Sequence, residues 1–220
     1  KPLVEAGQIE VIRPNLEGAL IGFAVPQSAY DAGLKTYADI AKFKDQLGGK
    51  IYSIEAGSSA NSTILKAISD NAFDLGAFEL VESSEQGMLA QVQRSIQAEQ
   101  PILFFGWRPH PMNVRHKLAY LTGGNDMFGP NDGAATVLTN TRAGFAKECP
   151  NLGKFLSNLA FTVEAEDMMM SYVLDEGLEP KAAAARWLKD NPTALDAWLA
   201  DVTTATGEPA LPAAKAALGL

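Results

Sequence analysis

Residues 101–107 read PILFFGW and form the most apolar stretch of the sequence. An uncharged apolar run of this length is typical of a β-strand that is buried on both faces. The same pattern occurs in residues 19–25, ALIGFAV, which are followed by Pro26. Strands of this kind occur in sheets that helices cover from two sides, so these runs predict an α/β fold.

Helical and strand patterns alternate between these two runs. Thr36–Leu47 places apolar residues on one helical face and ends at a pair of glycines. Lys50–Ile54 and Phe78–Val81 have strand patterns, and each is followed by a serine-containing turn and a helix. Ser83, with Gln86 three residues later, matches the capping box that starts a helix. The alternation predicts a parallel sheet with helices on both faces.

The pattern changes toward the end of the chain. Ala134–Thr139 predicts one further strand, and almost everything from Asn151 onward has helical periodicity. The helices are expected to break at Gly177, Pro180 and Asn191-Pro192. An α/β unit followed by a mainly helical tail is therefore expected.

The composition restricts the class of partner. The chain has 220 residues, of which 47% are hydrophobic and 20% charged, an ordinary globular balance. Its net charge of -8 disfavours binding to nucleic acid, because the surface repels phosphates. The apolar runs are much shorter than the ~20 residues that a membrane-spanning helix needs. The first residues, Lys1-Pro2-Leu3-Val4, do not match a signal peptide, so we expect a mature or trimmed chain.

The sequence gives no support for catalysis or for a cofactor. It contains two histidines, His110 and His116, and one cysteine, Cys149, without the spacing of metal ligands. The glycine-rich phosphate-binding fingerprints and the nucleophile elbow are missing too. We therefore expect a protein that binds without a cofactor or a metal.

The strongest candidate for a binding residue is Trp107, at the carboxyl end of the most apolar strand. Ligands of open α/β sheets bind at this end of the strands. An indole ring there can hold an alkylammonium cation by cation–π attraction and apolar contact. It can equally close the core of the sheet, and its position alone leaves both interpretations open.

Two other turns follow strands and open helices. In Glu55-Ala56-Gly57-Ser58-Ser59-Ala60-Asn61, the free N–H groups, Ser58 and Asn61 could meet a hydroxyl or carboxylate group. Ordinary capping of a helix by a serine explains the same pattern. Capping also explains Glu82-Ser83-Ser84-Glu85-Gln86-Gly87-Met88.

Several motifs resemble the choline-binding proteins of bacterial ATP-driven uptake systems, within the glycine-betaine and choline family of type II periplasmic binding proteins. The likeness extends along nearly the whole chain, and its tryptophan, proline, histidine and methionine stretch is fairly specific. The motifs are Ser83–Gln91, Gly106-Trp107-Arg108-Pro109-His110-Pro111-Met112-Asn113, Phe128-Gly129-Pro130, Glu148-Cys149-Pro150-Asn151 and Ala183–Pro192.

The resemblance implies two α/β lobes joined by a hinge, with the ligand enclosed between them. Residues 17–130 would form the second lobe, with a parallel sheet, and residues 1–16 and 131–220 the remainder of the first. It also implies a periplasmic protein that captures choline or a betaine and delivers it to the membrane permease of an importer. Candidate ligands are choline, glycine betaine, carnitine and trimethylamine oxide.

The resemblance also assigns roles to site residues. Trp107 matches a tryptophan of the aromatic box that holds the trimethylammonium head. Ser58 matches a polar contact that is asparagine in close relatives, and Ile21 matches a box tyrosine. Phe23, two residues along the same strand and face, is a further candidate contact, and His110 is expected to shape the loop.

The start of the chain departs from the family pattern. The chain begins after the opening strands of the first lobe, which supply other box tryptophans, so that lobe is expected to be incomplete. In related proteins the cysteine that matches Cys149 pairs with one near the N-terminus. An incomplete lobe would leave an apolar surface and a free sheet edge, which predicts self-association, checked by size-exclusion chromatography at two concentrations.

Two other functions remain open at this stage. One is the effector-sensing domain of a transcription regulator, which shares the fold class but would need a DNA-binding domain. The other is a small α/β enzyme that acts on an amino alcohol, for which Glu55 and His110 are the only candidate acid–base pair.

Overall fold

The computed structural model describes residues 2–220, whose contacts divide the chain into two compact units. Unit 2 is Leu20–Ala135, and unit 1 combines the residues up to Ala19 with Thr136–Leu220. Strands β1 (Ile9–Pro26) and β6 (Ala134–Arg142) have residues in both units and pair with each other. The divisions follow Ala19 and Ala135, and the lobe boundaries expected near residues 17 and 130 stay a prediction.

Unit 2 contains a mixed sheet with the strand order β3-β2-β4-β1-β5. β2 pairs parallel with both β3 and β4, whereas β1 pairs antiparallel with β4 and β5. The prediction of a parallel sheet is therefore wrong for β1. A fully buried strand is apolar along its length in either direction, so its sequence does not report its direction. The other strands are β2 (Lys50–Tyr52), β3 (Glu79–Val81), β4 (Phe104–Arg108) and β5 (Leu118–Tyr120).

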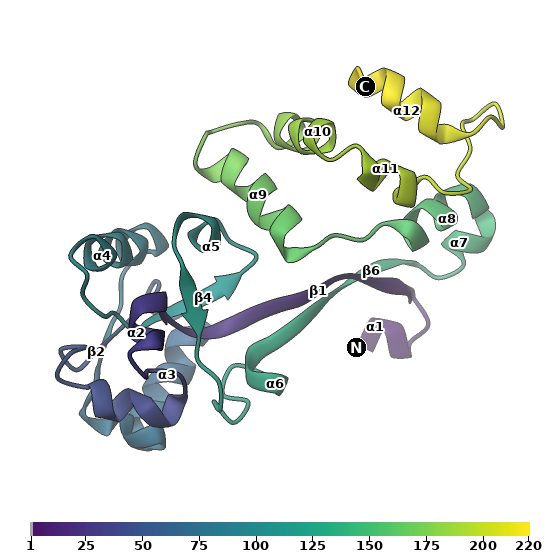
Figure 1. Ribbon diagram of the computed structural model, residues 1–220. Helices are drawn as coiled ribbons and strands as arrows, with labels where there is room; N and C mark the ends of the chain where they lie inside the picture. The colour runs from purple at the N-terminus through teal and green to yellow at the C-terminus, as the bar shows by residue number, and fades with distance from the viewer. Residues whose placement is uncertain (1) are drawn as a thin grey trace. The chain divides into compact units, whose positions relative to one another are not determined.

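The helices of unit 2 cover both faces of this sheet (Figure 1). Phe23, Val25 and Phe105 belong to a core cluster under α3, η1 and η2. Ala24 and Phe104, which alternate with them, belong to a second cluster under α4 and α5. The expectation of a sheet buried on both faces is confirmed. The helices are α2 (Gln27–Asp31), η1 (Tyr37–Phe43), α3 (Ser59–Ser69), η2 (Ala72–Ala77), α4 (Glu85–Gln97), α5 (Met112–Arg115) and α6 (Pro130–Gly133).

Two helix predictions in unit 2 differ from the structure in detail. The segment predicted as a helix over Thr36–Leu47 forms the short 3₁₀ helix η1. The helix predicted to start from Ser83 is capped one residue later, because the hydroxyl of Ser84 accepts the backbone N–H of Gly87 at 3.1 Å. Adjacent serines give the same capping signal, so the sequence alone does not choose between them.

The helical tail predicted from Asn151 onward is confirmed, and the helices of this part of unit 1 begin slightly earlier, at Phe145. Helices α9 and α10 lie side by side (Figure 1), and Arg186 stacks 4.0 Å from the ring centroid of Tyr172. Cys149 lies between α7 and α8, half-buried and with a free thiol. The helices of this unit are α1 (Pro2–Glu5), α7 (Phe145–Glu148), α8 (Pro150–Asn158), α9 (Val163–Leu174), α10 (Pro180–Asp190), α11 (Thr193–Trp198) and α12 (Ala210–Leu218).

Within residues 2–220, every helix falls short of the length and apolar character that crossing a bilayer demands.

Candidate functional site

Three loops, which follow β2, β3 and β4, leave the unit 2 sheet at the carboxyl ends of these strands, and the first and third lead to the predicted residues Ser58, Asn61 and His110. Because β2 is parallel to both β3 and β4, the loops that follow these strands start side by side. Two side-chain contacts join the loops, one between Asn61 and Glu82 and one between His110 and Glu85. This region lies at the carboxyl ends of the strands, where open α/β sheets bind ligands. We call it the carboxyl edge.

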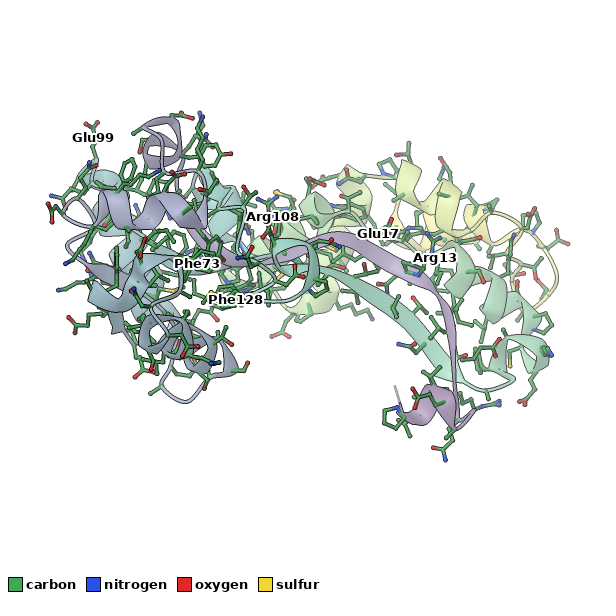
Figure 2. All side chains as sticks on the ribbon, turned by 90° about the horizontal axis from the view of Figure 1, so that it is seen from below. Arg13, Glu17, Phe73, Glu99, Arg108 and Phe128 are labelled. Atoms are coloured by element: carbon green, nitrogen blue, oxygen red, sulfur yellow. The ribbon has the colours of Figure 1, made fainter. Side chains whose placement is uncertain are left out.

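Trp107 lies one residue before the end of β4, which Arg108 closes (Figure 2). Its ring contacts Phe105, with centroids 5.7 Å apart, and meets His110 edge-on at 4.9 Å. The side chain is half-buried and packs against the core clusters on both faces of the sheet. The core therefore fixes the ring while the residue stays partly accessible, and a ligand contact by Trp107 stays a prediction.

The loop after Trp107 is held in place by side chains of its own. His110 is 4% exposed, and its Nδ1 accepts the backbone N–H of Met112 at 3.2 Å. The proton of the neutral ring is then on Nε2, which donates to Oε1 of Glu85 at 3.2 Å. Asn113 donates from Nδ2 to the carbonyl oxygens of Trp107 and His110, at 3.0 and 2.9 Å. These hydrogen bonds hold the His110 ring against the indole.

Ser58 and Asn61 lie at the start of α3. The hydroxyl oxygen of Ser58 accepts the backbone N–H of Asn61 at 3.2 Å and caps the helix. Asn61 is 1% exposed, and the two hydrogens of its Nδ2 are shared among three acceptors, the carbonyl oxygens of residues 54 and 55, at 3.0 Å each, and Glu82 at 2.9 Å. Its Oδ1 accepts the hydroxyl of Ser53 at 2.6 Å. Asn61 therefore braces the loop from inside, and the half-buried Ser58 is the accessible member of the pair.

Phe23 and Ile21 occupy the same face of β1. The antiparallel register places Ile21 opposite Trp107 and Phe23 opposite Phe105. Ile21 is 36% exposed, and directly paired residues have Cβ atoms about 4.5–5.5 Å apart, so Ile21 borders the indole. Phe23 is fully buried, stacks on Tyr37 at 5.1 Å and meets Phe128 (Figure 2) edge-on at 5.5 Å. A ligand contact by Phe23 stays a prediction, and here Phe23 forms the wall behind the site.

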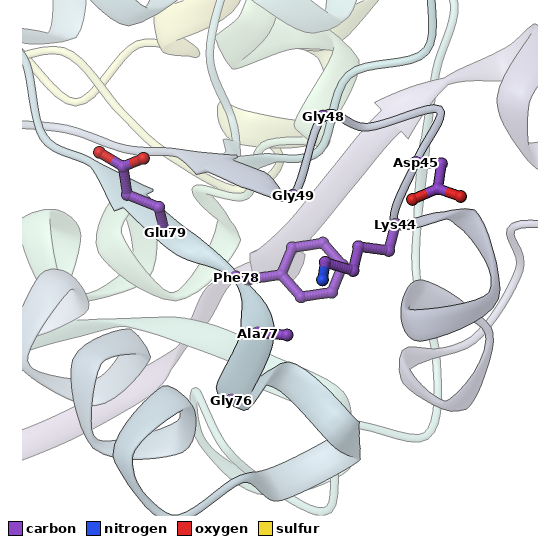
Figure 3. A pocket seen from close by; sticks show the side chains of 8 residues that line it. All are labelled: Lys44, Asp45, Gly48, Gly49, Gly76, Ala77, Phe78 and Glu79. Carbon is purple, nitrogen blue, oxygen red and sulfur yellow. The ribbon is translucent and has the colours of Figure 1, made fainter.

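A hollow of about 570 Å³ lies at the opposite edge of the same sheet (Figure 3). Lys44, Gly49, Phe78 and Glu79 are among its lining residues, and they lie around the starts of β2 and β3. This hollow thus lies at the amino ends of β2 and β3, and the residues that line it include none of the predicted site residues.

A second hollow, of about 380 Å³, lies in unit 1. Trp187 and Trp198 stack in it with centroids 5.9 Å apart, and Phe161 meets Trp198 edge-on at 5.1 Å. Its one carboxylate is Glu166, whose pKa is raised by burial and then by the neighbouring charge of Asp167. We call this region the unit 1 hollow. It is lined by Phe161, Glu166, Met169, Met170, Ala184, Trp187, Leu188 and Trp198.

In the described part of the chain, no three histidine, cysteine, aspartate or glutamate side chains come close enough together to hold a metal ion.

A comparison with models of protein families identifies the family of this chain. Residues 1–190 match the family model for the substrate binding domain of ABC-type glycine betaine transport systems. The chain belongs to this family. The family and the type II periplasmic binding protein fold expected from the sequence are both confirmed.

Solved structures of this family resemble the chain closely. A choline-binding protein of an ABC transporter, in complex with choline, is 50% identical, with a TM-score of 0.73, over 99% of this chain and 75% of that one. The lactococcal OpuAC protein in its closed form with glycine betaine is 28% identical, with a TM-score of 0.64, over 86% of this chain and 70% of that one.

A curated relative is the glycine betaine/carnitine transport binding protein GbuC of Listeria monocytogenes serotype 1/2a (strain 10403S). It is 29% identical over 164 residues, which are 74% of this chain and 53% of the relative. The chain therefore spans about half the length of this curated relative.

Glu82, Glu85 and Asn113 were not predicted as functional residues. Each belongs to a stretch that the sequence marked, but capping explained the first two and nothing distinguished the third. Their partners lie 21, 25 and 6 residues away in the chain. Only the parallel order of β2, β3 and β4 brings the glutamates to their partners, and single-sequence patterns do not contain this order.

Proposed function

We propose that this chain captures a quaternary-ammonium compound, choline or a betaine, as part of a solute-binding protein. The protein acts in the periplasm and delivers its ligand to the membrane permease of an ATP-driven importer. The observation that carries the proposal is Trp107, accessible yet fixed between the core and His110 at the carboxyl edge. The 50% identical choline-binding protein supports this choice of ligand class.

The chemistry of the ligand explains the choice of an aromatic contact. A trimethylammonium group has no N–H to donate, so hydrogen-bond acceptors cannot select it. An indole face attracts the cation through the ring quadrupole, and the neighbouring Ile21 adds apolar contact with the methyl groups. Ser58 and the free N–H groups at the start of α3 can meet a hydroxyl or a carboxylate on the ligand's tail.

No catalytic step belongs to this proposal. The acid–base pair considered for an enzyme was Glu55 with His110, but the structure gives His110 the carboxylate of Glu85 as a partner. His110 is 4% exposed, and its ring braces Trp107 instead of facing solvent. Its place supports a role in shaping the loop.

Calorimetric titration of choline and glycine betaine tests the proposal. The Trp107→Leu substitution keeps apolar area but removes the π system, and Trp107→Phe keeps a smaller ring. Affinity should fall in the order Trp, Phe, Leu, with about 30-fold lost at leucine, since a desolvated cation–π contact is worth about 2 kcal/mol.

Two controls sharpen this titration. The neutral carbon analogue of choline, with a tert-butyl group in place of the trimethylammonium head, has the same shape without the charge and should bind much more weakly. Val114→Ala, on the exposed side of the same loop, should leave affinity unchanged. Equal binding of choline and its neutral analogue, or no binding of either onium compound by the folded chain, would contradict the proposal.

A further inference from the structure

The loop between β3 and α4 connects the two halves of the carboxyl edge. Glu82 is the first residue of this loop and Glu85 is the first residue of α4. The carboxylate of Glu82 accepts a hydrogen bond from Asn61 at the start of α3, and that of Glu85 accepts one from His110 after β4. Ser84, between them, supplies the helix cap, so neither glutamate is needed as the N-cap of α4. Capping therefore does not account for the two carboxylates, and although Glu85 suits the first turn of α4 as an acidic residue, this does not explain its bond to His110.

Glu82 acts on the α3 side of the edge. Its Oε1 accepts from Nδ2 of Asn61 at 2.9 Å, and a charged acceptor makes this the strongest of the hydrogen bonds from that amide group. The backbone N–H of the same Asn61 donates to the hydroxyl of Ser58. The position of Ser58 is thus linked to Glu82 through one buried residue.

Glu85 acts on the β4 side in the same manner. Its Oε1 lies 3.2 Å from Nε2 of His110, whose other nitrogen is occupied by the backbone N–H of Met112. With both nitrogens engaged, the imidazole ring is fixed in orientation, and it packs at a steep angle against the ring of Trp107. The orientation of Trp107 is thus linked to Glu85, again through one buried residue.

We infer that Glu82 and Glu85 are two independent positioning residues of the ligand site. Glu82 sets the polar contact at Ser58 through Asn61, and Glu85 sets the face of Trp107 through His110. The inference rests on the proposed function for its ligand, and it adds that the head and the tail of the ligand are controlled separately. Neither glutamate needs to touch the ligand.

Three ligands separate the two roles by calorimetric titration. Tetramethylammonium has only the cationic head, whereas choline and glycine betaine have the head and a polar tail. Glu85→Ala should weaken all three ligands by a similar factor, about tenfold, since one hydrogen bond that positions the head is lost. Glu82→Ala should weaken choline and glycine betaine about as much, but leave tetramethylammonium within about twofold of the parent chain.

Conservative variants and a distant glutamate are the controls. Glu82→Gln and Glu85→Gln keep a carbonyl acceptor at each place and should restore most of the affinity. Glu79→Ala removes an exposed glutamate at the other end of β3 (Figure 3) and should change nothing. Equal losses for all three ligands in both alanine variants, or no loss in either, would overturn the inference.

A measurement without ligand separates this inference from the proposed function. The indole N–H signal of Trp107 in the NMR spectrum is assigned by its disappearance in Trp107→Phe. Glu85→Ala should shift or broaden this signal, while Glu82→Ala and Glu79→Ala leave it in place. An unmoved signal in Glu85→Ala overturns the inference. A moved signal in a chain that binds no onium compound supports the positioning role and rejects the proposed function.

Discussion

Tryptophans mark two regions of this molecule, the carboxyl edge of unit 2 and the unit 1 hollow, and the two are built differently. In the hollow, Trp187 and Trp198 stack on each other, so each covers part of the other's face. At the carboxyl edge, Trp107 contacts the rings of Phe105 and His110, and a hydrogen bond between His110 and Glu85 holds the second of these rings. A cation needs an aromatic face that is held still, so volume and aromatic content alone do not identify the site.

The polar groups of the two regions differ in the same way. At the carboxyl edge the buried amide of Asn61 has partners for its oxygen and its nitrogen. In the hollow the carboxyl group of Glu166 sits among apolar side chains, and burial raises its pKa. A polar network in which every group has a partner specifies one arrangement of side chains. Apolar surroundings, in contrast, destabilise the charged form of a carboxyl group.

The largest effect is expected from Asn61→Asp, which changes one atom of the carboxyl edge. The new carboxylate would face the carbonyl oxygens of residues 54 and 55 and the carboxylate of Glu82 without a proton to donate. The free energy of unfolding at neutral pH should fall by ~3 kcal/mol or more, the scale for a buried uncompensated charge. Urea denaturation measures this loss.

A matched control for this substitution is Asn71→Asp. The side-chain oxygen of Asn71 accepts the backbone N–H of Gly76 at 2.8 Å, and a carboxylate can accept it equally well. This variant should stay within about 0.5 kcal/mol of the parent chain. Similar losses in both variants would mean that the bonds of Asn61 do not organise the carboxyl edge.

A smaller effect is expected from Tyr37→Phe, in the wall behind the site. The hydroxyl of Tyr37 accepts the buried backbone N–H of Phe23 at 3.2 Å, so its removal leaves a buried donor without this partner. The loss should be about 1–2 kcal/mol of unfolding free energy. The half-buried Tyr30 offers the control Tyr30→Phe, which should change stability much less.

The same hydroxyl predicts a pH dependence. Burial raises the pKa of Tyr37 to about 12, from 10.0 for an exposed tyrosine. A raised pKa means that the folded chain holds this proton more tightly than the unfolded chain. The contribution of Tyr37 to the free energy of unfolding is therefore complete below pH 10 and is lost as the pH rises toward about 12. Stability of the parent chain should fall over this interval by more than that of Tyr37→Phe, and parallel profiles would contradict this assignment.

The smallest effect is expected in the unit 1 hollow, from Glu166→Gln. Burial raises the pKa of Glu166, so its protonated form contributes to the free energy of unfolding. This contribution is complete at acid pH, below the pKa of an exposed glutamate, and is lost as the pH rises through the raised value. At neutral pH the glutamine variant should therefore melt higher, by about 1–2 °C for a chain of this size. Calorimetric scans at neutral and acid pH measure this, and the gain should vanish in acid. A lower melting temperature at neutral pH would show that the carboxylate has a stabilising partner.

Local patterns were enough to predict the α/β class, a strand near residues 101–107 and the helical tail, although the strand itself begins only at Phe104 and ends at Arg108. The apolar run from Ile102 to Phe105 fixes burial on both faces, and helical periodicity marks Val163–Leu174 and Pro180–Asp190. These features depend on neighbours in sequence, so one chain contains the information. The position of Trp107 at a strand end was predicted for the same reason.

Features that depend on strand order were not predictable in this way. The antiparallel direction of β1 and its long first half from Ile9 have no signature that separates them from other apolar or mixed segments. The partners of Glu82 and Glu85 come from other loops, so capping was the simplest account of both residues. The burial of Phe23 agrees with the apolar run in residues 19–25, but its pairing with Phe105 is given only by the register of the sheet.

The most direct test follows the three indole N–H signals of the chain during titration with choline. The three belong to Trp107, Trp187 and Trp198, and single substitutions to phenylalanine assign them. The account predicts that the Trp107 signal moves progressively to saturation while the signals of Trp187 and Trp198 stay in place. Movement of the latter two signals with an unchanged Trp107 would place the ligand in the unit 1 hollow and contradict the account.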